Sequence, residues 1–276
     1  MPRISFGSWG LAEWGDIDKE ADIRLILEAY EKGLTFFDTA PVYGKGYAER
    51  MLSHLPKTAH ISTKIPAKNK SPNLNEAYSL EWMHSNLYSS LERLERDKLD
   101  LVYLHNWSYM WKDYIRLLEY LKIYSARKIV NKWGISLPSE PPKNLGDLQK
   151  LLLEEIIGAV QIHYNLLQTQ NYEIIKLAIE SGKLVFIRSP LLHGLIPDPS
   201  DNFDESRLDK DHTKEEIMSL KKRVINETRG LGNVSSAVRF AISKIFIETR
   251  ADSVIMGIRS KYHLEDAVAL NDFLLG

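Results

Sequence analysis

Short apolar runs alternate with longer stretches of helical periodicity along the whole chain, and this alternation limits the possible folds more than any other feature. Each run has the length and composition of a strand. Because the runs are apolar on both faces, they predict parallel strands that are covered by helices. The predicted strands are residues 3–7, 34–38, 60–64, 99–105, 129–136, 158–165, 183–189 and 252–257.

Amphipathic segments lie between the predicted strands. The first helix is expected between Asp18, a suitable N-cap, and Gly33, a suitable C-terminal stop. A later segment has apolar residues at spacings of three and four, which predicts one buried helix face made of Leu80, Met83, Leu87, Leu91 and Leu94. Further helices are expected at about 45–55, 109–126, 144–155, 169–182 and 261–274, with an extra pair within 213–248.

Eight strands that alternate with helices predict a closed (β/α)8 TIM barrel, which fits a chain of 276 residues as a single domain over residues 1–276. An open doubly wound α/β sheet is the alternative. The GxGxxG turn expected after its first strand is missing, because GSWGLAEWG has its glycines at other spacings. The longest irregular segment, 190–213, is expected to be either a functional lid or a disordered excursion.

Composition narrows the classes of partner. The chain has 36 Lys and Arg against 37 Asp and Glu, with no long charged block, so nucleic acid is not expected as a partner. No apolar stretch approaches the roughly 18 to 20 residues that span a bilayer, and the N-terminus does not resemble a signal peptide. The absence of cysteine excludes thiolate metal sites. We expect a cytoplasmic protein, monomeric or a small homo-oligomer, without a metal ion.

Ionisable side chains follow several predicted strands at their carboxyl ends, where TIM barrels carry their active sites. Asp38 ends the second strand with Tyr43 just beyond it, Lys64 ends the third, and His105 ends the fourth. Each residue alone is more often a turn, cap or core group, but their joint occurrence favours a site. A phenol beside an ammonium group is a usable general acid, because a nearby positive charge lowers the pKa of a phenol from about 10.

These residues also resemble a known family. DTAPVYG, the Lys of ISTK, and LDLVYLHN are similar to the three active-site motifs of the aldo-keto reductase superfamily, and the similarity extends from FGSW to MGIRSKYHLEDAV. The resemblance implies a catalytic tetrad of Asp38, Tyr43, Lys64 and His105. It also implies an NAD(P)H-dependent oxidoreductase that reduces an aldehyde, ketone or keto-sugar, with Tyr43 as proton donor and NADPH as the usual cofactor.

The resemblance further implies positions that bind the cofactor. Ser136 and Gln161 would bind the nicotinamide carboxamide, and Arg188 lies where many relatives have a stacking ring. At the adenine end, Asp266 and Ala267 stand where the family usually has Glu-Asn, so NADH remains possible. The complete set of expected cofactor-binding residues is Gly7, Ser8, Trp9, Ser136, Gln161, Arg188, Ser189, Leu191, Gly257, Arg259 and Ser260.

Trp14 and Trp107 follow the first and fourth strands, near the proposed mouth of the barrel, and are expected to bind a small-molecule carbonyl substrate. Two other functions are possible. The protein could be a nucleotide-binding regulatory subunit with little turnover. The complete tetrad argues against this function, because binding alone does not need a proton donor. It could also be a lyase or aldolase with Lys64 as Schiff base, but a neighbouring Asp38 would hold Lys64 charged.

Overall fold

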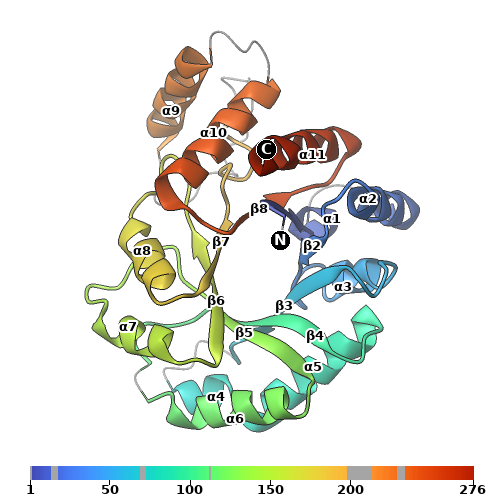
Figure 1. Cartoon of the computed structure of the whole chain (residues 1–276), viewed down its shortest axis with the longest axis vertical. Helices are drawn as coiled ribbons and strands as arrows, with labels where there is room; N and C mark the ends of the chain where they lie inside the picture. Colours follow the sequence, from blue (N-terminus) through green and yellow to red (C-terminus); the bar gives the residue numbers. More distant parts are fainter. Residues whose placement is uncertain (1, 14–17, 69–72, 112, 198–212, 229–233) are drawn as a thin grey trace.

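Eight parallel strands close into a barrel in the computed structural model, with every strand paired to its neighbours in chain order and β8 paired to β1. Figure 1 shows this ring of strands with the helices outside it. The predicted (β/α)8 barrel is therefore confirmed. The strands are β1 (Ile4–Gly7), β2 (Phe36–Asp38), β3 (His60–Pro66), β4 (Leu99–His105), β5 (Val130–Ser136), β6 (Ile157–His163), β7 (Leu184–Arg188) and β8 (Ser253–Gly257).

The structure describes residues 2–13, 18–68, 73–111, 113–197, 213–228 and 234–276. Within these ranges no helix has both the length and the apolar character needed to cross a membrane. The short helices α1 and α4 were not predicted, because one turn is too short to show helical periodicity. The helices are α1 (Trp9–Glu13), α2 (Lys19–Glu31), α3 (Tyr47–Leu52), α4 (Leu74–Ala77), α5 (Leu80–Leu94), α6 (Ile115–Ala126), α7 (Gly146–Leu153), α8 (Tyr172–Glu180), α9 (Lys214–Glu227), α10 (Val234–Thr249) and α11 (Lys261–Leu275).

Local signals place the helix ends. The Asp18 side chain accepts a hydrogen bond from the Ala21 backbone N–H at the start of α2, and Gly33 takes a positive φ of 92° just after its end. The predicted apolar stripe of α5 is buried from Met83 to Leu94. Leu80 does not belong to it and is 41% exposed, because the first side chain of a helix leans past the helix start.

Large side chains fill the interior of the barrel. Phe36, Tyr103 and Phe186 pack there with ring contacts between them. Gly134 makes room for this layer, since a Cβ at that position would lie 2.6 Å from Cδ1 of Tyr103. The barrel is therefore closed by packed side chains, and a ligand can be held only at one end of it.

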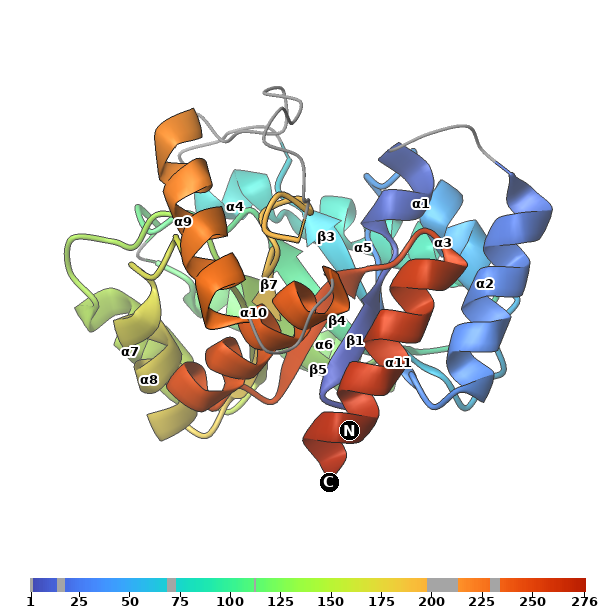
Figure 2. The ribbon, with the colours of Figure 1, turned by 90° about the horizontal axis from the view of Figure 1, so that it is seen from above.

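The extra helix pair between β7 and β8 supports that end. Figure 2 shows α9 and α10 side by side next to the barrel. Leu192, Leu195 and Ile196, from the segment after β7, pack in one apolar cluster with side chains of α9 and α10. Residues 190–197 thus pack against the helix pair. Residues 198–212 of the predicted irregular segment lie outside the described part of the chain.

Candidate active site

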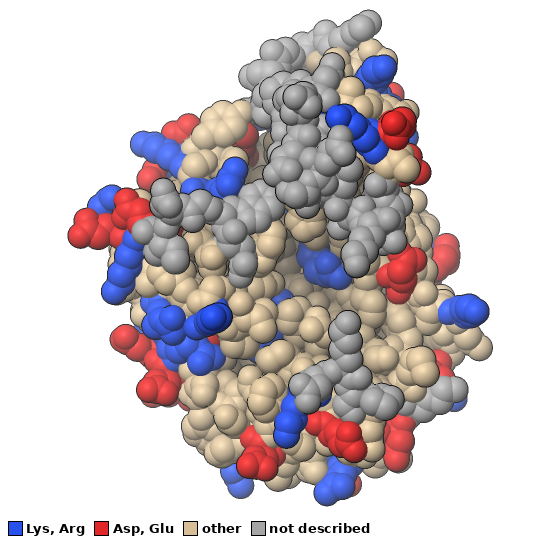
Figure 3. All heavy atoms as spheres, turned by 180° about the vertical axis from the view of Figure 1, so that it is seen from behind, with Lys and Arg blue, Asp and Glu red and all other residues tan. Residues whose placement is uncertain are grey.

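A cavity of about 790 Å³ opens at the carboxyl ends of the strands. The face of the molecule opposite to that in Figure 1 is hollowed near its centre, and basic side-chain atoms lie in the hollow (Figure 3). Its described lining comes from β1, β2, β4, β5, β6, β7 and β8 and from segments that follow several of them. It includes Gly7, Trp9, Asp38, Tyr43, His105, Asn106, Trp107, Ser136, Gln161, Arg188, Ser189, Leu191, His193, Gly257, Arg259, Tyr262, His263 and Asp266.

Asp38 and Lys64 form a buried ion pair at the base of the cavity. Lys64 Nζ lies 2.7 Å from Asp38 Oδ2 and donates a second hydrogen bond of 2.7 Å to the Thr39 carbonyl. Lys64 is only 1% exposed. Its burial acts to lower the pKa, but Asp38, and after it Tyr43, outweigh this effect, so the pKa of Lys64 lies above its usual value. Lys64 therefore stays charged at neutral pH.

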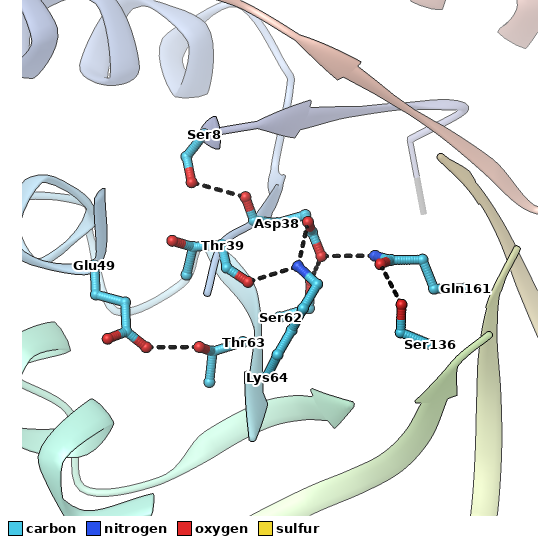
Figure 4. A network of polar contacts seen from close by, with 9 residues as sticks. All are labelled: Ser8, Asp38, Thr39, Glu49, Ser62, Thr63, Lys64, Ser136 and Gln161. Atoms are coloured by element: carbon cyan, nitrogen blue, oxygen red, sulfur yellow. Dashed lines mark hydrogen bonds and ion pairs between the residues drawn. The ribbon is translucent and has the colours of Figure 1, made fainter. Parts of the chain in front are cut away.

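Asp38 is also bonded to the adjacent strand β3 and to β6, which is not paired with β2. Its Oδ1 accepts hydrogen bonds from Ser62 Oγ at 2.8 Å and from Gln161 Nε2 at 2.9 Å. Ser136 Oγ in turn donates to Gln161 Oε1 at 3.1 Å. Figure 4 shows this chain of contacts running from Ser136 to Lys64. Of the residues expected to bind the cofactor, Gln161 is thus linked directly to the Asp38–Lys64 pair and Ser136 through Gln161. The sequence did not indicate this link.

Tyr43 lies in the turn between β2 and α3. Its ring centroid is 4.9 Å from Lys64 Nζ, and it lines the same cavity as His105. The turn needs Gly44, which has a positive φ of 56° and where a Cβ would lie 2.6 Å from Cβ of Ala12. The structure therefore brings together all four residues of the predicted tetrad.

His105 is neutral at physiological pH. Burial, followed by the charges of Lys64 and Arg188, lowers the pKa of His105 from 6.5 to about 3. Its Nδ1 is buried and has no hydrogen-bond partner among the described residues. The backbone carbonyl of His105 accepts a hydrogen bond from the hydroxyl of Tyr78, which fixes the end of β4. A buried, unpartnered imidazole nitrogen in a cavity is suited to bond a ligand.

Most of the residues expected to bind a cofactor line the cavity, but two do not. Ser8 is fully buried and donates to the Asp38 carbonyl at 2.9 Å, so it supports β2. Ser260 caps α11 by accepting from the His263 backbone N–H at 3.3 Å. Gly7, Trp9, Ser136, Gln161, Arg188, Ser189, Leu191, Gly257 and Arg259 are the expected residues that do line it.

The guanidinium group of Arg188 is held at the wall of the cavity. It donates to His163 Nδ1 at 3.0 Å and to the Leu137 carbonyl at 3.1 Å. Its influence on the pKa of His105 places its charge within electrostatic reach of the tetrad. β7 ends at Arg188, so this residue lies at the rim of the barrel, and its partners come from neighbouring strands and the loops that follow them.

The two tryptophans expected to bind substrate have different outcomes. Trp107 lines the cavity but is only 4% exposed, because its ring packs edge-on against Trp111 at 5.3 Å. It therefore presents little area to a ligand. Trp14 lies outside the described residues.

Sequence reasoning missed cavity residues that come from loops. His193 packs its ring 5.6 Å from that of Trp9, and both line the cavity. Asn106 follows His105 with a left-handed φ of 60°, and His193 is also left-handed, with a φ of 53°. Loop residues of this kind have no periodicity, so no signal in a single sequence marks them.

Comparisons with known proteins point to one family. The model of the Aldo/keto reductase family matches residues 3–276. The chain is 22% identical to L-galactose dehydrogenase of Arabidopsis thaliana over 287 aligned residues, which cover 98% of this chain and 84% of that enzyme. It is 26% identical to the NADH-specific methylglyoxal reductase of Escherichia coli over 216 residues, 71% of this chain and 65% of that enzyme.

The fold is also similar to solved structures. An aldo-keto reductase from Klebsiella pneumoniae, in complex with NADPH, superposes with a TM-score of 0.71 at 20% sequence identity. The superposition covers 99% of this chain and 86% of that one. At this level of identity the similarity supports the fold.

Proposed function

Because the chain belongs to the aldo/keto reductase family and is thus an NAD(P)H-dependent oxidoreductase, we propose that it reduces the carbonyl group of an aldehyde, ketone or keto-sugar to an alcohol, with Tyr43 as the proton donor. The observation that carries this proposal is the position of the Tyr43 ring, 4.9 Å from the buried Lys64 ammonium and in the same cavity as neutral His105. The names of the relatives, which include a sugar dehydrogenase and a methylglyoxal reductase, favour a small polar carbonyl compound.

The cavity fits a nicotinamide dinucleotide. Its volume of about 790 Å³ is within the roughly 300 to 1,000 Å³ of small-molecule sites. Gly257 lines it, and a Cβ there would meet nothing within 4 Å, which leaves open space beside β8. Arg188 and Arg259 add positive charge for a phosphorylated ligand, and the N-terminus of α11 begins just after Arg259. Ser136 and Gln161 line the cavity with a hydroxyl and an amide group, which would bind the carboxamide.

NADPH is the proposed donor, with NADH as the alternative. When bound, the reduced nicotinamide supplies the hydride. The Klebsiella structure is a complex with NADPH, whereas the Escherichia coli relative is named as NADH-specific. Arg259 supports NADPH, because its guanidinium is suited to a further phosphate group.

The protein's own residues account for the proton. Tyr43 gives its phenolic proton to the carbonyl oxygen as negative charge develops there. The Lys64 ammonium stabilises the phenolate that remains, and Asp38 keeps Lys64 charged in a buried position. His105, held neutral by its surroundings, offers a hydrogen bond that orients the substrate oxygen.

The two other functions differ in their chemistry. A lyase or aldolase would need a neutral Lys64 amine as nucleophile, but its ion pair with Asp38 and its raised pKa keep it protonated. A regulatory subunit would bind the nucleotide and turn over slowly or not at all. The tetrad geometry favours catalysis over that function.

The decisive experiment measures binding and turnover separately. Purified protein is titrated with NADPH and NADH, and cofactor oxidation is then followed against a panel of small aldehydes, ketones and keto-sugars. We expect Tyr43→Phe to retain cofactor affinity and to lose roughly 100- to 10,000-fold in kcat. Ser85→Ala, which changes a hydroxyl on an exposed part of α5, serves as the control.

Each alternative has its own outcome. Turnover that survives Tyr43→Phe undiminished would refute the role of Tyr43 as proton donor. Tight binding of the cofactor without turnover on any member of a broad panel would support the regulatory function. Trapping of a carbonyl compound on Lys64 by borohydride would support the lyase.

A further inference from the structure

Tyr43 is held in place differently from its two charged neighbours. Asp38 and Lys64 belong to strands β2 and β3, so the barrel itself fixes them. Tyr43 lies in a turn that continues into α3, so the position of that helix contributes to fixing the far end of the turn. We propose that Glu49, Thr63 and Arg93, here called the positioning cluster, hold Tyr43 against Lys64. This inference rests on the proposed role of Tyr43 as the proton donor.

Glu49 is the centre of the positioning cluster. It lies on α3 and is fully buried. Its Oε1 accepts a hydrogen bond of 2.6 Å from Thr63 Oγ1, and its Oε2 accepts one of 2.6 Å from Arg93 Nε. Figure 4 shows the contact between Glu49 and Thr63 directly beside the Lys64–Asp38 pair. A buried carboxylate is stable only with such partners, so a different position of α3 would leave the charge of Glu49 uncompensated.

Thr63 connects the cluster to the reacting groups through one peptide unit. Successive side chains of a strand point to opposite faces, so Thr63 faces the helices while Lys64 faces the barrel interior. Both residues are buried. A shift of Glu49 relative to Thr63 is therefore also a shift of α3 relative to the strand that carries Lys64.

Arg93 connects the cluster to the turn of Tyr43. A Cβ on Gly46 would lie 2.5 Å from Cδ and 2.8 Å from Nε of Arg93, so the backbone of Gly46 rests directly on this side chain. Gly46 is three residues after Tyr43 and has a positive φ of 83° at the start of α3. The positioning cluster thus contacts the turn on one side of the Tyr43–Lys64 pair and the strand on the other.

A double role in stability and in positioning needs a test that separates them. Thr63→Val removes one hydroxyl donor to Glu49 and keeps the shape of the side chain. Thr249→Val is the matched control, because Thr249 is equally buried and donates a hydrogen bond of 2.6 Å to the Ile245 carbonyl on α10, far along the chain from the cluster. Melting temperature, kcat and KM are measured for both variants and for the unaltered protein.

We expect Thr63→Val to lower kcat by roughly 10- to 100-fold with KM within about twofold, since small misplacements of a reacting group have effects of this size. Thr249→Val should lower the melting temperature while it leaves kcat unchanged. Equal effects of the two variants on kcat, or an effect of Thr63→Val on KM and not on kcat, would overturn the inference.

A second variant, Arg93→Lys, tests the same inference if Thr63→Val does not fold. Arg93→Lys keeps a positive charge for Glu49 but removes the Nε donor and the planar surface under Gly46. It should lower kcat by a smaller factor than Thr63→Val and leave KM within about twofold, and an unchanged kcat would contradict the inference. If Tyr43→Phe retains full turnover, the proposed function fails; if Tyr43→Phe is inactive and Thr63→Val behaves like Thr249→Val, only the positioning role fails.

Discussion

His105 should make the protein less stable in acid by an amount that its surroundings determine. The pKa of His105 is about 3 in the folded chain and 6.5 in the unfolded chain. Between these two pH values, the unfolded chain therefore binds a proton on His105 and the folded chain does not. The stability that neutral His105 provides is present above pH 6.5 and is lost as the pH falls toward 3. Each pH unit below 6.5 lowers the free energy of unfolding by about 1.4 kcal/mol. The loss between pH 7.5 and 4.5 is therefore roughly 2.5 kcal/mol.

The variant His105→Gln isolates this contribution, because glutamine is neutral throughout the range while all other groups stay the same. Urea unfolding at pH 7.5 and 4.5, followed by tryptophan fluorescence, gives the free energy of unfolding for each protein. Between pH 7.5 and 4.5, we expect the free energy of unfolding of His105→Gln to fall by roughly 2.5 kcal/mol less than that of the unaltered chain. The exposed His60→Gln is the control and should follow the unaltered chain. Equal losses for His105→Gln and the unaltered chain would refute the reasoning.

Three further predictions concern buried groups in the barrel. Asp38→Asn should lower the free energy of unfolding by about 3 to 5 kcal/mol, because it leaves the charge of Lys64 unpaired. In the same urea assay, adding Lys64→Met should recover part of this loss, and a double variant as unstable as the single one would contradict the prediction. Tyr103→Phe should change the melting temperature little or raise it, because the buried hydroxyl has no partner among the described residues; a large drop would show that a hidden partner exists. Gly134→Ala should cost about 1 to 3 kcal/mol, because the new Cβ would lie 2.8 Å from the Ala159 carbonyl oxygen; normal stability would mean that the strands yield at this point.

Local patterns in the chain predicted the architecture because they follow from backbone geometry. The apolar run 99–105 became β4 without any change of bounds, and Asp18 and Gly33 marked the ends of α2. Where the pattern was short, it failed: α1 and α4 span too few residues to repeat. The convergence of Asp38, Lys64 and His105 was also predictable, since the carboxyl ends of parallel strands meet at one end of a barrel.

The sequence by itself determined the barrel and the end of it where Asp38, Lys64 and His105 converge, because hydrophobic periodicity and strand ends are written along the chain. The catalytic tetrad of these residues with Tyr43 stays a prediction from the resemblance to the family. Only the tertiary structure decided how these groups are held. The bond between Gln161 and Asp38 joins residues 123 positions apart, and the contacts of Glu49 join a helix, a strand and a second helix. The low pKa of His105 likewise depends on its burial and on charges from two other strands. Hydrogen bonds and desolvation vary over distances of a few ångströms, and closure of the barrel, which no local pattern encodes, fixes those distances.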